Sequence, residues 1–384
     1  MPGEGGFTGA GPSSRVESQR PGLGTQDRTR QDRSPWPRRE EVRHLSAELP
    51  IQAVALDVDG TLLQADLRVT RRTRMSVRAL RAQGIRVIIA TGRRIGTASR
   101  YGRAAGAGPT ADIVALDGAL VTEAGGRHAL RTVAIEAESA RQILGWAEDL
   151  GLAFVVNTRT HLYGTPGQAS RQVIREHHRR GIFRTFSGAL HTLWEIPPLK
   201  PWGQLDPRRE GMLKFSPLGP REATAALRER IERADLPVHL TTPGGPYYEI
   251  VARGISKGEG LSWLLGERGV SAEHTLAIGD GWNDVQMFLR VGHSVAMGNA
   301  PSGVKGYARW VTLSVDEGGV AEVLERVAAG NWPPLDGAAE VREEPQPSFG
   351  GSGPDSRGPA QGGGRKAAGP GGRGGHAADE SPDV

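Results

Sequence analysis

Short apolar runs alternate with amphipathic segments through the middle of the chain, from about residue 50 to residue 333. A continuous apolar run bounded by glycine or polar residues is typical of a strand buried on both faces. Between the first two runs, Thr70 can cap a helix that extends to Gln83, with Gly84 suited to the position after its end. The apolar runs themselves predict strands at residues 51–56, 86–90, 112–116, 275–278 and 294–297.

Strands that alternate with helices predict a parallel sheet with helices on both faces, because each parallel connection has to cross over the sheet. A further amphipathic segment at 320–327 predicts a closing helix. The expected fold class is therefore α/β, with a doubly wound, Rossmann-like core.

A long stretch of different character separates the third and fourth predicted strands. A loop of that length without structure of its own is uncommon inside a compact domain. We therefore expect an inserted α+β domain that acts as a cap. Its pattern predicts helices at 135–150 and 221–234, and strands at 153–156, from Lys214 onward, at 238–241 and at 247–251.

Both ends of the chain are rich in glycine, proline and charged residues and show no apolar periodicity. Such segments cannot bury enough apolar surface to fold. Translation that starts downstream of Met1, for instance at Val42, is a further hypothesis. The predicted organisation begins with a disordered N-terminal tail at residues 1–48 and a core formed by residues 49–122 and 250–333. A cap at residues 123–249 is inserted into this core, and a disordered C-terminal tail at residues 334–384 follows it.

Composition narrows the classes of function. The 384 residues include 48 basic and 43 acidic ones, and a net charge of +5 gives little support to nucleic-acid binding. The chain has no cysteine, which excludes disulfides, zinc–thiolate sites and cysteine nucleophiles. No apolar segment approaches the roughly 20 residues of a membrane span, and the N-terminus lacks the apolar region of a signal peptide. We expect a cytoplasmic protein without nucleic-acid or membrane partners.

The first predicted strand ends in Asp57 and Asp59, followed by Gly60 and Thr61. Polar groups at the carboxyl end of such a strand face the crevice where open α/β sheets bind ligands. Two carboxylates there are costly unless a cation or phosphoryl chemistry needs them. One carboxylate can attack phosphorus, and the other can move protons if Gly60 lets the chain turn.

Three other segment ends carry compatible groups. Thr91-Gly92 offers a hydroxyl and backbone N–H groups to phosphate oxygens. Lys257, at a predicted helix start, can neutralise charge on a transferring phosphoryl group. One or two carboxylates of the Asp280, Asn283 and Asp284 cluster would complete an oxygen-rich Mg²⁺ shell.

Each of these features alone has an ordinary structural explanation. Aspartate, asparagine and glycine form turns and cap helices, and a lysine at a helix start is usually solvated. Their joint occurrence, each at a strand or helix boundary, favours a site for phosphoryl transfer over a set of turns.

In these motifs the sequence resembles the haloacid dehalogenase superfamily of phosphatases, and within it the Cof-like branch with a C2-type cap. The resemblance implies a Mg²⁺-dependent phosphatase that hydrolyses a small phosphate monoester through an aspartyl-phosphate. The substrate would be a sugar phosphate, a nucleotide or a phosphorylated cofactor. The resemblance spans residues 51 to about 330 and rests on Leu56-Asp57-Val58-Asp59-Gly60-Thr61-Leu62-Leu63, Ala90-Thr91-Gly92-Arg93, Ile255-Ser256-Lys257-Gly258, Ile278-Gly279-Asp280-Gly281-Trp282-Asn283-Asp284 and Ala296-Met297-Gly298-Asn299-Ala300.

The resemblance also implies a role for each motif residue. Asp57 would be the nucleophile and Asp59 the general acid and base. The phosphoryl group would be bound by Thr91, Gly92, Lys257 and Asn283. The Mg²⁺ ion would be held by the Asp57 carboxylate, the Asp59 carbonyl and Asp280, with Asp284 in support.

The sequence departs from the family at one motif, because Asp117-Gly118-Ala119 stands where the family often has Asn-Gly-Ala. The Asp117 carboxylate would repel an anionic substrate unless it is turned away or paired, for instance with Arg93. Alternatively the aspartate is a turn residue without catalytic meaning. The leaving group would be selected in the cap, where the candidate contacts are Arg159, His161, Tyr163 and the region of Trp202.

Two other classes of function stay open. The fold could be a phosphate-binding or regulatory module without turnover, although such a module has no need for a nucleophile and an acid/base together. The Gly/Arg-rich C-terminal tail could bind RNA, although it has few Gly-Arg-Gly units and no interleaved aromatic residues.

Overall fold

The structure is a computed structural model that describes residues 51–332 except 65, 166–198 and 245–246. The predictions for the two tails and for a start at Val42 lie outside the described residues. No helix in the described part of the chain combines the length and the apolar character of a membrane span.

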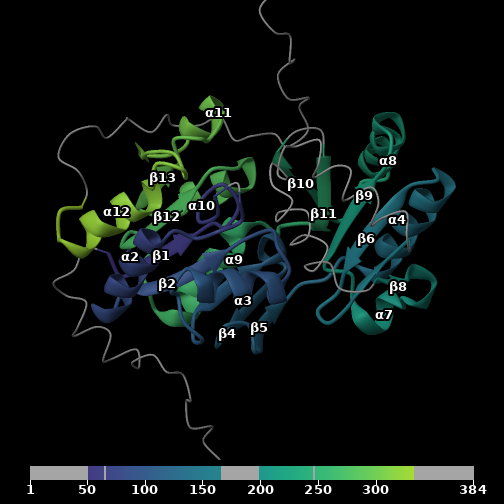
Figure 1. Cartoon of the computed structure of the whole chain (residues 1–384). Helices are drawn as coiled ribbons and strands as arrows, with labels where there is room; N and C mark the ends of the chain where they lie inside the picture. Colours follow the sequence, from purple (N-terminus) through teal and green to yellow (C-terminus); the bar gives the residue numbers. More distant parts are fainter. Residues whose placement is uncertain (1–50, 65, 166–198, 245–246, 333–384) are drawn as a thin grey trace, which may run out of the picture. The chain divides into compact units, whose positions relative to one another are not determined.

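The first sheet has eight strands in the order β14-β13-β12-β1-β2-β3-β4-β5 (Figure 1). The pairings from β14 to β3 are parallel, whereas β4 and β5 pair antiparallel at one edge. The five predicted strands are all present within one or two residues of their expected ends. The bounds are β1 (Ala53–Leu56), β2 (Arg86–Ala90), β3 (Asp112–Ala115), β4 (Leu120–Glu123), β5 (His128–Thr132), β12 (Thr275–Gly279), β13 (His293–Ala296) and β14 (Trp310–Val311).

Helices cover both faces of this sheet. Side chains alternate along a strand, so Val54 and Leu56 of β1 join one apolar cluster while Ala53 and Ala55 join another. The first cluster includes α2 (Arg71–Ala82), α3 (Ile95–Ala104) and α12 (Gly319–Ala328), and the second includes α9 (Lys257–Arg268), α10 (Val285–Phe288) and α11 (Ser302–Lys305). Figure 1 shows α2 and α12 side by side at the edge of the purple strands. The α/β class with helices on both faces is confirmed.

The predicted caps of α2 are also present. The Thr70 side chain accepts a hydrogen bond from the Thr73 backbone N–H at 3.0 Å, Gln83 is the C-cap, and Gly84 follows with a positive φ of 81°.

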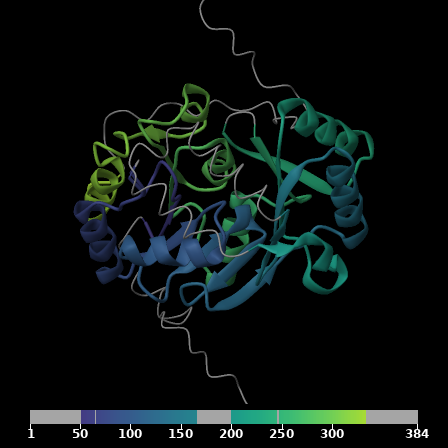
Figure 2. The same cartoon turned by 45° about the vertical axis from the view of Figure 1, so that its right-hand side comes forward.

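The second sheet has six strands in the order β10-β11-β9-β6-β7-β8, and all its pairings except β7 with β8 are antiparallel. The helices α4 (Ala137–Asp149) and α8 (Arg221–Arg233) contact each other and contribute Ile143, Leu227 and Ile231 to the core (Figure 2). The strands are β6 (Ala153–Asn157), β7 (Leu162–Gly164), β8 (Lys200–Pro201), β9 (Lys214–Leu218), β10 (Val238–Gly244) and β11 (Tyr247–Ala252), and the short helix α7 (Pro207–Glu210) precedes β9.

Along the sequence, the boundaries between the two sheets differ slightly from the boundaries expected between core and cap. The strand β5, within the residues expected to belong to the cap, pairs with β4 in the first sheet. The strand β11 pairs in the second sheet up to Ala252 and so takes in the first three residues of the expected core segment 250–333. The β5 pairing follows from a tight hairpin, since Ala124, Gly125 and Gly126 have positive φ and return the chain along β4.

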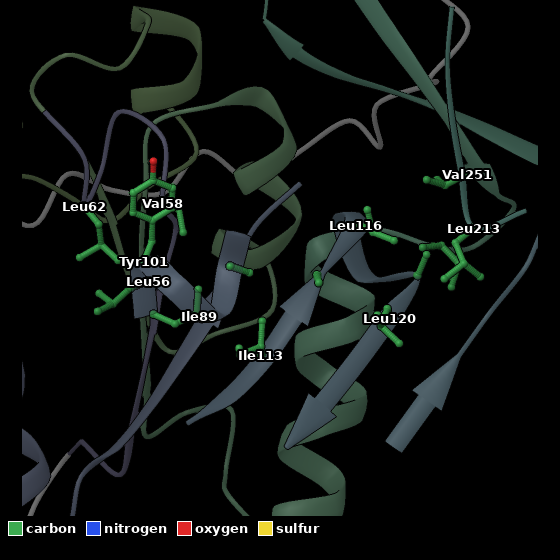
Figure 3. Close-up of a cluster of buried hydrophobic side chains, with 14 of the residues drawn as sticks. Leu56, Val58, Leu62, Ile89, Tyr101, Ile113, Leu116, Leu120, Leu213 and Val251 are labelled. Carbon is green, nitrogen blue, oxygen red and sulfur yellow. The ribbon is translucent and has the colours of Figure 1, made fainter. Parts of the chain in front are cut away.

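One apolar cluster joins the two sheets. Figure 3 shows Leu116 and Leu120, next to the carboxyl end of β3 and at the start of β4, near Leu213, which precedes β9, and Val251 of β11. These four side chains are buried, with at most 2 % of their surface exposed. The second sheet is therefore packed against the first through apolar contact beside the strand ends that carry the candidate site.

Candidate active site

The carboxyl ends of β1, β2 and β12 bring together the predicted site residues. Asp57 follows β1, Thr91 follows β2 and Asp280 follows β12, and these strands are neighbours in the sheet. Asp57 and Thr91 are buried, whereas Asp280 is half-buried. Parallel strands end on the same edge, which is why residues far apart in the sequence converge here.

Lys257 lies at the start of α9 and reaches this edge. The Ser256 side chain caps the helix by accepting from the Glu259 N–H at 3.1 Å. The Lys257 ammonium donates to Asp57 Oδ1 at 2.6 Å and to Asp284 Oδ1 at 2.7 Å, and all three side chains are buried. Burial alone would lower the pKa of Lys257, but Asp284 and Asp57 raise it well above its usual value. The lysine is therefore a fixed cation between two carboxylates.

Three carboxylates surround a position suited to a cation. Oxygens of Asp57, Asp280 and Asp284 all lie within 4.8 Å of one another. Burial and the neighbouring Asp284 raise the pKa of Asp57 well above its usual value, and the same two causes raise the pKa of Asp280 to about 7. Carboxylate oxygens are hard ligands that Mg²⁺ prefers, so the group fits this ion and a bound cation would relieve the repulsion.

Asp284 differs from the other two carboxylates in how its oxygens are used. Its Oδ2 accepts from the backbone N–H groups of Asp280 at 3.0 Å and Gly281 at 2.9 Å, while Oδ1 accepts from Lys257. Asp284 therefore fixes the turn that carries Asp280. This geometry fits support of a metal site better than direct coordination.

Asn299 is a site residue whose role the sequence analysis did not recognise. Its Nδ2 donates to the Gly60 carbonyl at 2.9 Å and to Asp280 Oδ2 at 3.2 Å, while its Oδ1 accepts from the Val315 N–H at 2.9 Å. Asn299 thus ties the turn after β1 to the turn after β12. Its place in the Met297-Gly298-Asn299 motif was the available signal.

Asp59 is exposed and held by an arginine. The Arg93 guanidinium donates to both of its oxygens, from Nε at 2.7 Å and from Nη2 at 2.5 Å. Arg93, named above as one possible partner of Asp117, thus holds Asp59, and the carboxylate of Asp117 is paired with Lys214. Asp59 lies where it can exchange protons with water, as a general acid and base must.

Asp117 and Asn283 contact each other beside this edge. Asn283 Nδ2 donates to Asp117 Oδ1 at 3.0 Å. Asp117 has φ 53° and ψ 33°, a left-handed conformation that aspartate and asparagine adopt more readily than most residues. Its carboxylate is nevertheless buried and paired, with Lys214 of β9 at 3.0 Å. Asp117 is a turn residue, and it also carries a charge into the site.

The four residues that were expected to select the leaving group lie in or beside the second sheet. Arg159 is exposed, and Tyr163 is buried and donates its hydroxyl to Glu210, which also accepts from His161 at 3.2 Å. Trp202 packs edge-on against Phe154, with ring centroids 5.9 Å apart. Except for Arg159 these side chains pack within the second sheet, and the described contacts do not bring them to the strand-end carboxylates.

Two curated phosphatases are similar to this chain over most of its length. The chain is 26 % identical over 290 residues to the phosphatase YwpJ of Bacillus subtilis, covering 72 % of this chain and 100 % of the relative. It is also 26 % identical over 300 residues to the 5-amino-6-(5-phospho-D-ribitylamino)uracil phosphatase YwtE of the same organism, covering 73 % and 100 %.

The fold is shared with a solved haloacid dehalogenase-like hydrolase from B. subtilis, with a TM-score of 0.63, 25 % identity, and coverage of 72 % of this chain and 99 % of that one. The haloacid dehalogenase-like hydrolase family itself matches residues 54–324, from the second residue of β1 into α12. This match contains every strand-end residue described above and more than half of the chain. The chain therefore belongs to the haloacid dehalogenase-like hydrolases.

Proposed function

We propose that the protein is a Mg²⁺-dependent phosphatase that hydrolyses a small phosphate monoester through an aspartyl-phosphate on Asp57. The observation that carries this proposal is the buried group of Asp57, Lys257 and Asp284, with Asp280 within 4.8 Å of both carboxylates. A nucleophilic carboxylate beside a fixed cation and a cation site is what phosphoryl transfer requires. The relatives named above are phosphatases, which supports the same reaction class.

In the first step an Asp57 oxygen attacks phosphorus, and the bond between phosphorus and the leaving oxygen breaks. Asp59 donates a proton to that oxygen, so an alcohol leaves. In the second step water attacks phosphorus while Asp59 takes its proton. The bond to Asp57 breaks, which releases phosphate and restores both carboxyl groups. Asp59 is suited to both transfers because it is exposed to solvent.

The remaining residues would bind and balance charge. The Thr91 hydroxyl, the Gly92 N–H, the Asn283 amide and the Lys257 ammonium are the proposed donors to phosphoryl oxygens. Asp57, the Asp59 carbonyl and Asp280 are the proposed ligands of Mg²⁺, with Asp284 holding the turn. When bound, Mg²⁺ offsets the negative charge that gathers as the phosphoryl group is transferred.

The substrate is proposed only as a class: a sugar phosphate, a nucleotide or a phosphorylated cofactor. The relative YwtE is named for 5-amino-6-(5-phospho-D-ribitylamino)uracil, which is itself a small phosphate monoester. The expected cytoplasmic location stays a prediction.

The test is turnover of a panel of phosphate monoesters by the full chain, with and without Mg²⁺. We expect Mg²⁺-dependent release of phosphate from at least one ester. The Asp57→Asn variant should lose this activity by at least about 10⁴-fold, while its circular dichroism and melting temperature show a folded protein. Full activity in Asp57→Asn, or turnover unaffected by a chelator, contradicts the proposal. Phosphate binding without turnover of any ester would favour the alternative of a non-catalytic module.

A further inference from the structure

Lys214, the first residue of β9 in the second sheet, reaches into the first sheet. Its ammonium donates to the Gly92 carbonyl at 2.7 Å and to Asp117 Oδ2 at 3.0 Å. The third donation goes to Glu249 Oε2 of β11 at 2.5 Å. Only 5 % of the side chain is exposed. The three protons of the ammonium are therefore matched by three acceptors, two of which belong to the first sheet.

The Asp117 carboxylate lies against the backbone that is proposed to bind phosphate. A Cβ added to Gly92 would be 3.0 Å from each of its oxygens. The Asp117 carboxylate also accepts a hydrogen bond from Asn283, whose amide is proposed to donate to phosphate. A buried carboxylate in this position repels an incoming phosphate dianion unless a cation compensates it.

Asp117 is held in its charged form. Burial alone would raise its pKa, but Lys214 and then Lys257 outweigh burial and lower it. Burial likewise would lower the pKa of Lys214, while Asp117 and Glu249 raise it. The two groups thus form an ion pair whose acidic member belongs to the phosphate-binding edge and whose basic member belongs to the cap.

We propose that Lys214 is a positioning residue through which the cap sets the anion affinity of the site, by neutralising Asp117 and holding it against Asn283. This inference rests on the proposed phosphatase function. Lys214 does not itself bind phosphate, because its three donors are already used. The aspartate that departs from the family motif is therefore tolerated because the second sheet supplies its counter-ion. Phosphate affinity then depends on the contact between the two sheets.

The test is a cycle of variants: Lys214→Met, Asp117→Asn and the two combined. The readout is the dissociation constant of inorganic phosphate in the presence of Mg²⁺, measured by calorimetry on the full chain. Lys214→Met removes the nearest cation from the buried Asp117 carboxylate and leaves only Lys257 to offset it, so we expect phosphate affinity to fall by about 10- to 100-fold. Asp117→Asn removes the carboxylate, so the combined variant should recover to within roughly three-fold of the wild-type protein.

The matched control is Lys200→Met. Lys200 also belongs to the second sheet, but its ammonium lies 5.7 Å from the Tyr163 ring centroid, within that sheet. This change lowers the net charge as much as Lys214→Met does, and it should leave phosphate affinity unchanged. If Lys214→Met does not fold, Lys214→Gln replaces it in the cycle with Asp117→Asn, because glutamine keeps a hydrogen-bond donor.

The affinity cycle separates positioning from a purely structural role. If the role of Lys214 is purely structural, Lys214→Met loses stability and the combined variant recovers it, while the phosphate affinity of the folded protein stays constant in both. That result overturns the proposal. Equal weakening in Lys214→Met and the combined variant overturns it as well, and so does the absence of phosphate binding by the wild-type protein. If the cycle behaves as expected but no ester is hydrolysed, the proposed function fails while the role of Lys214 stands.

Discussion

At the scale of single residues, Gly60 shows how little space separates the turn after β1 from the Asp280 carboxylate. It has a positive φ of 70°, and a Cβ at this position would lie 2.1 Å from Asp280 Oδ2. A residue with a side chain would both strain the turn and displace a proposed metal ligand. The turn after β1 and the carboxylate after β12 therefore fit together only because residue 60 is glycine.

We predict that Gly60→Ala abolishes most Mg²⁺-dependent turnover while the protein still folds. Its matched control is Gly84→Ala, because Gly84 has a similar φ of 81° but nothing within 4 Å of an added Cβ. Both variants should lose roughly 1–2 kcal/mol of stability from the left-handed backbone. Only Gly60→Ala should also lose about 100-fold in kcat/KM, because displaced catalytic groups cost about that much. Equal activity of the two variants would show that Asp280 is not needed where it lies.

Sequence reasoning found the residues at the strand ends but not their partners. Asp57, Thr91 and Asp280 were predictable because parallel strands end at one edge and each residue follows an apolar run. The pairs Arg93–Asp59 and Lys214–Asp117 join residues 34 and 97 positions apart through long side chains. Such pairs depend on rotamers and on the placement of the inserted sheet, neither of which a pattern along the chain specifies.

At the scale of elements, the start of α9 carries the central cation of the site. Ser256 caps this helix, and Lys257 is its first residue, so the capping bond also fixes the origin of the lysine side chain. Gly118 belongs to the same contact, since a Cβ there would lie 2.2 Å from the Ser256 carbonyl. The helix start and the turn after β3 are packed backbone to backbone.

We predict that Ser256→Ala lowers both stability and activity, whereas Thr70→Ala lowers stability alone. Each residue accepts a hydrogen bond from the backbone at a helix start, at 3.1 Å for Ser256 and 3.0 Å for Thr70. Losing a cap costs about 1 kcal/mol in either case. A loosened α9 also misplaces Lys257, so kcat should fall roughly ten-fold in Ser256→Ala only. Chemical denaturation and steady-state kinetics on the two variants measure both effects; identical kinetics would contradict the link between cap and site.

Most elements followed from their apolar patterns, but the short strands β4, β5 and β7 did not. The strand β2 and the helix α2 have the expected bounds to within a residue or so. The strand β5 was missed because its residues are partly or fully exposed at an edge of the sheet, which leaves no apolar run to detect. Its antiparallel return also breaks the alternation of strands and helices that predicted a purely parallel sheet.

At the scale of the whole molecule, the site sits at the edge of one sheet and receives a charged group from another. The first sheet supplies the carboxylates and Lys257, while β9 and β11 supply Lys214 and Glu249. Like charges kept close together in a folded state reduce its stability. The three clustered carboxylates therefore make the stability of the molecule dependent on the cation that they are proposed to bind.

We predict that Mg²⁺ raises the melting temperature of the wild-type protein but not that of Asp280→Asn. At a Mg²⁺ concentration 100 times the dissociation constant, binding to the native state adds about 2.7 kcal/mol, which corresponds to roughly 5 °C for a domain of this size. Without Mg²⁺, Asp280→Asn should melt at or above the wild-type temperature, because it removes one of three mutually repelling carboxylates. Asp316→Asn, a change at an exposed aspartate outside the group, should respond to Mg²⁺ as the wild-type protein does. An equal rise in melting temperature in all three proteins would place the cation elsewhere. Loss of the rise in Asp280→Asn alone shows that the cation stabilises the molecule through the same carboxylates that are proposed to act in catalysis.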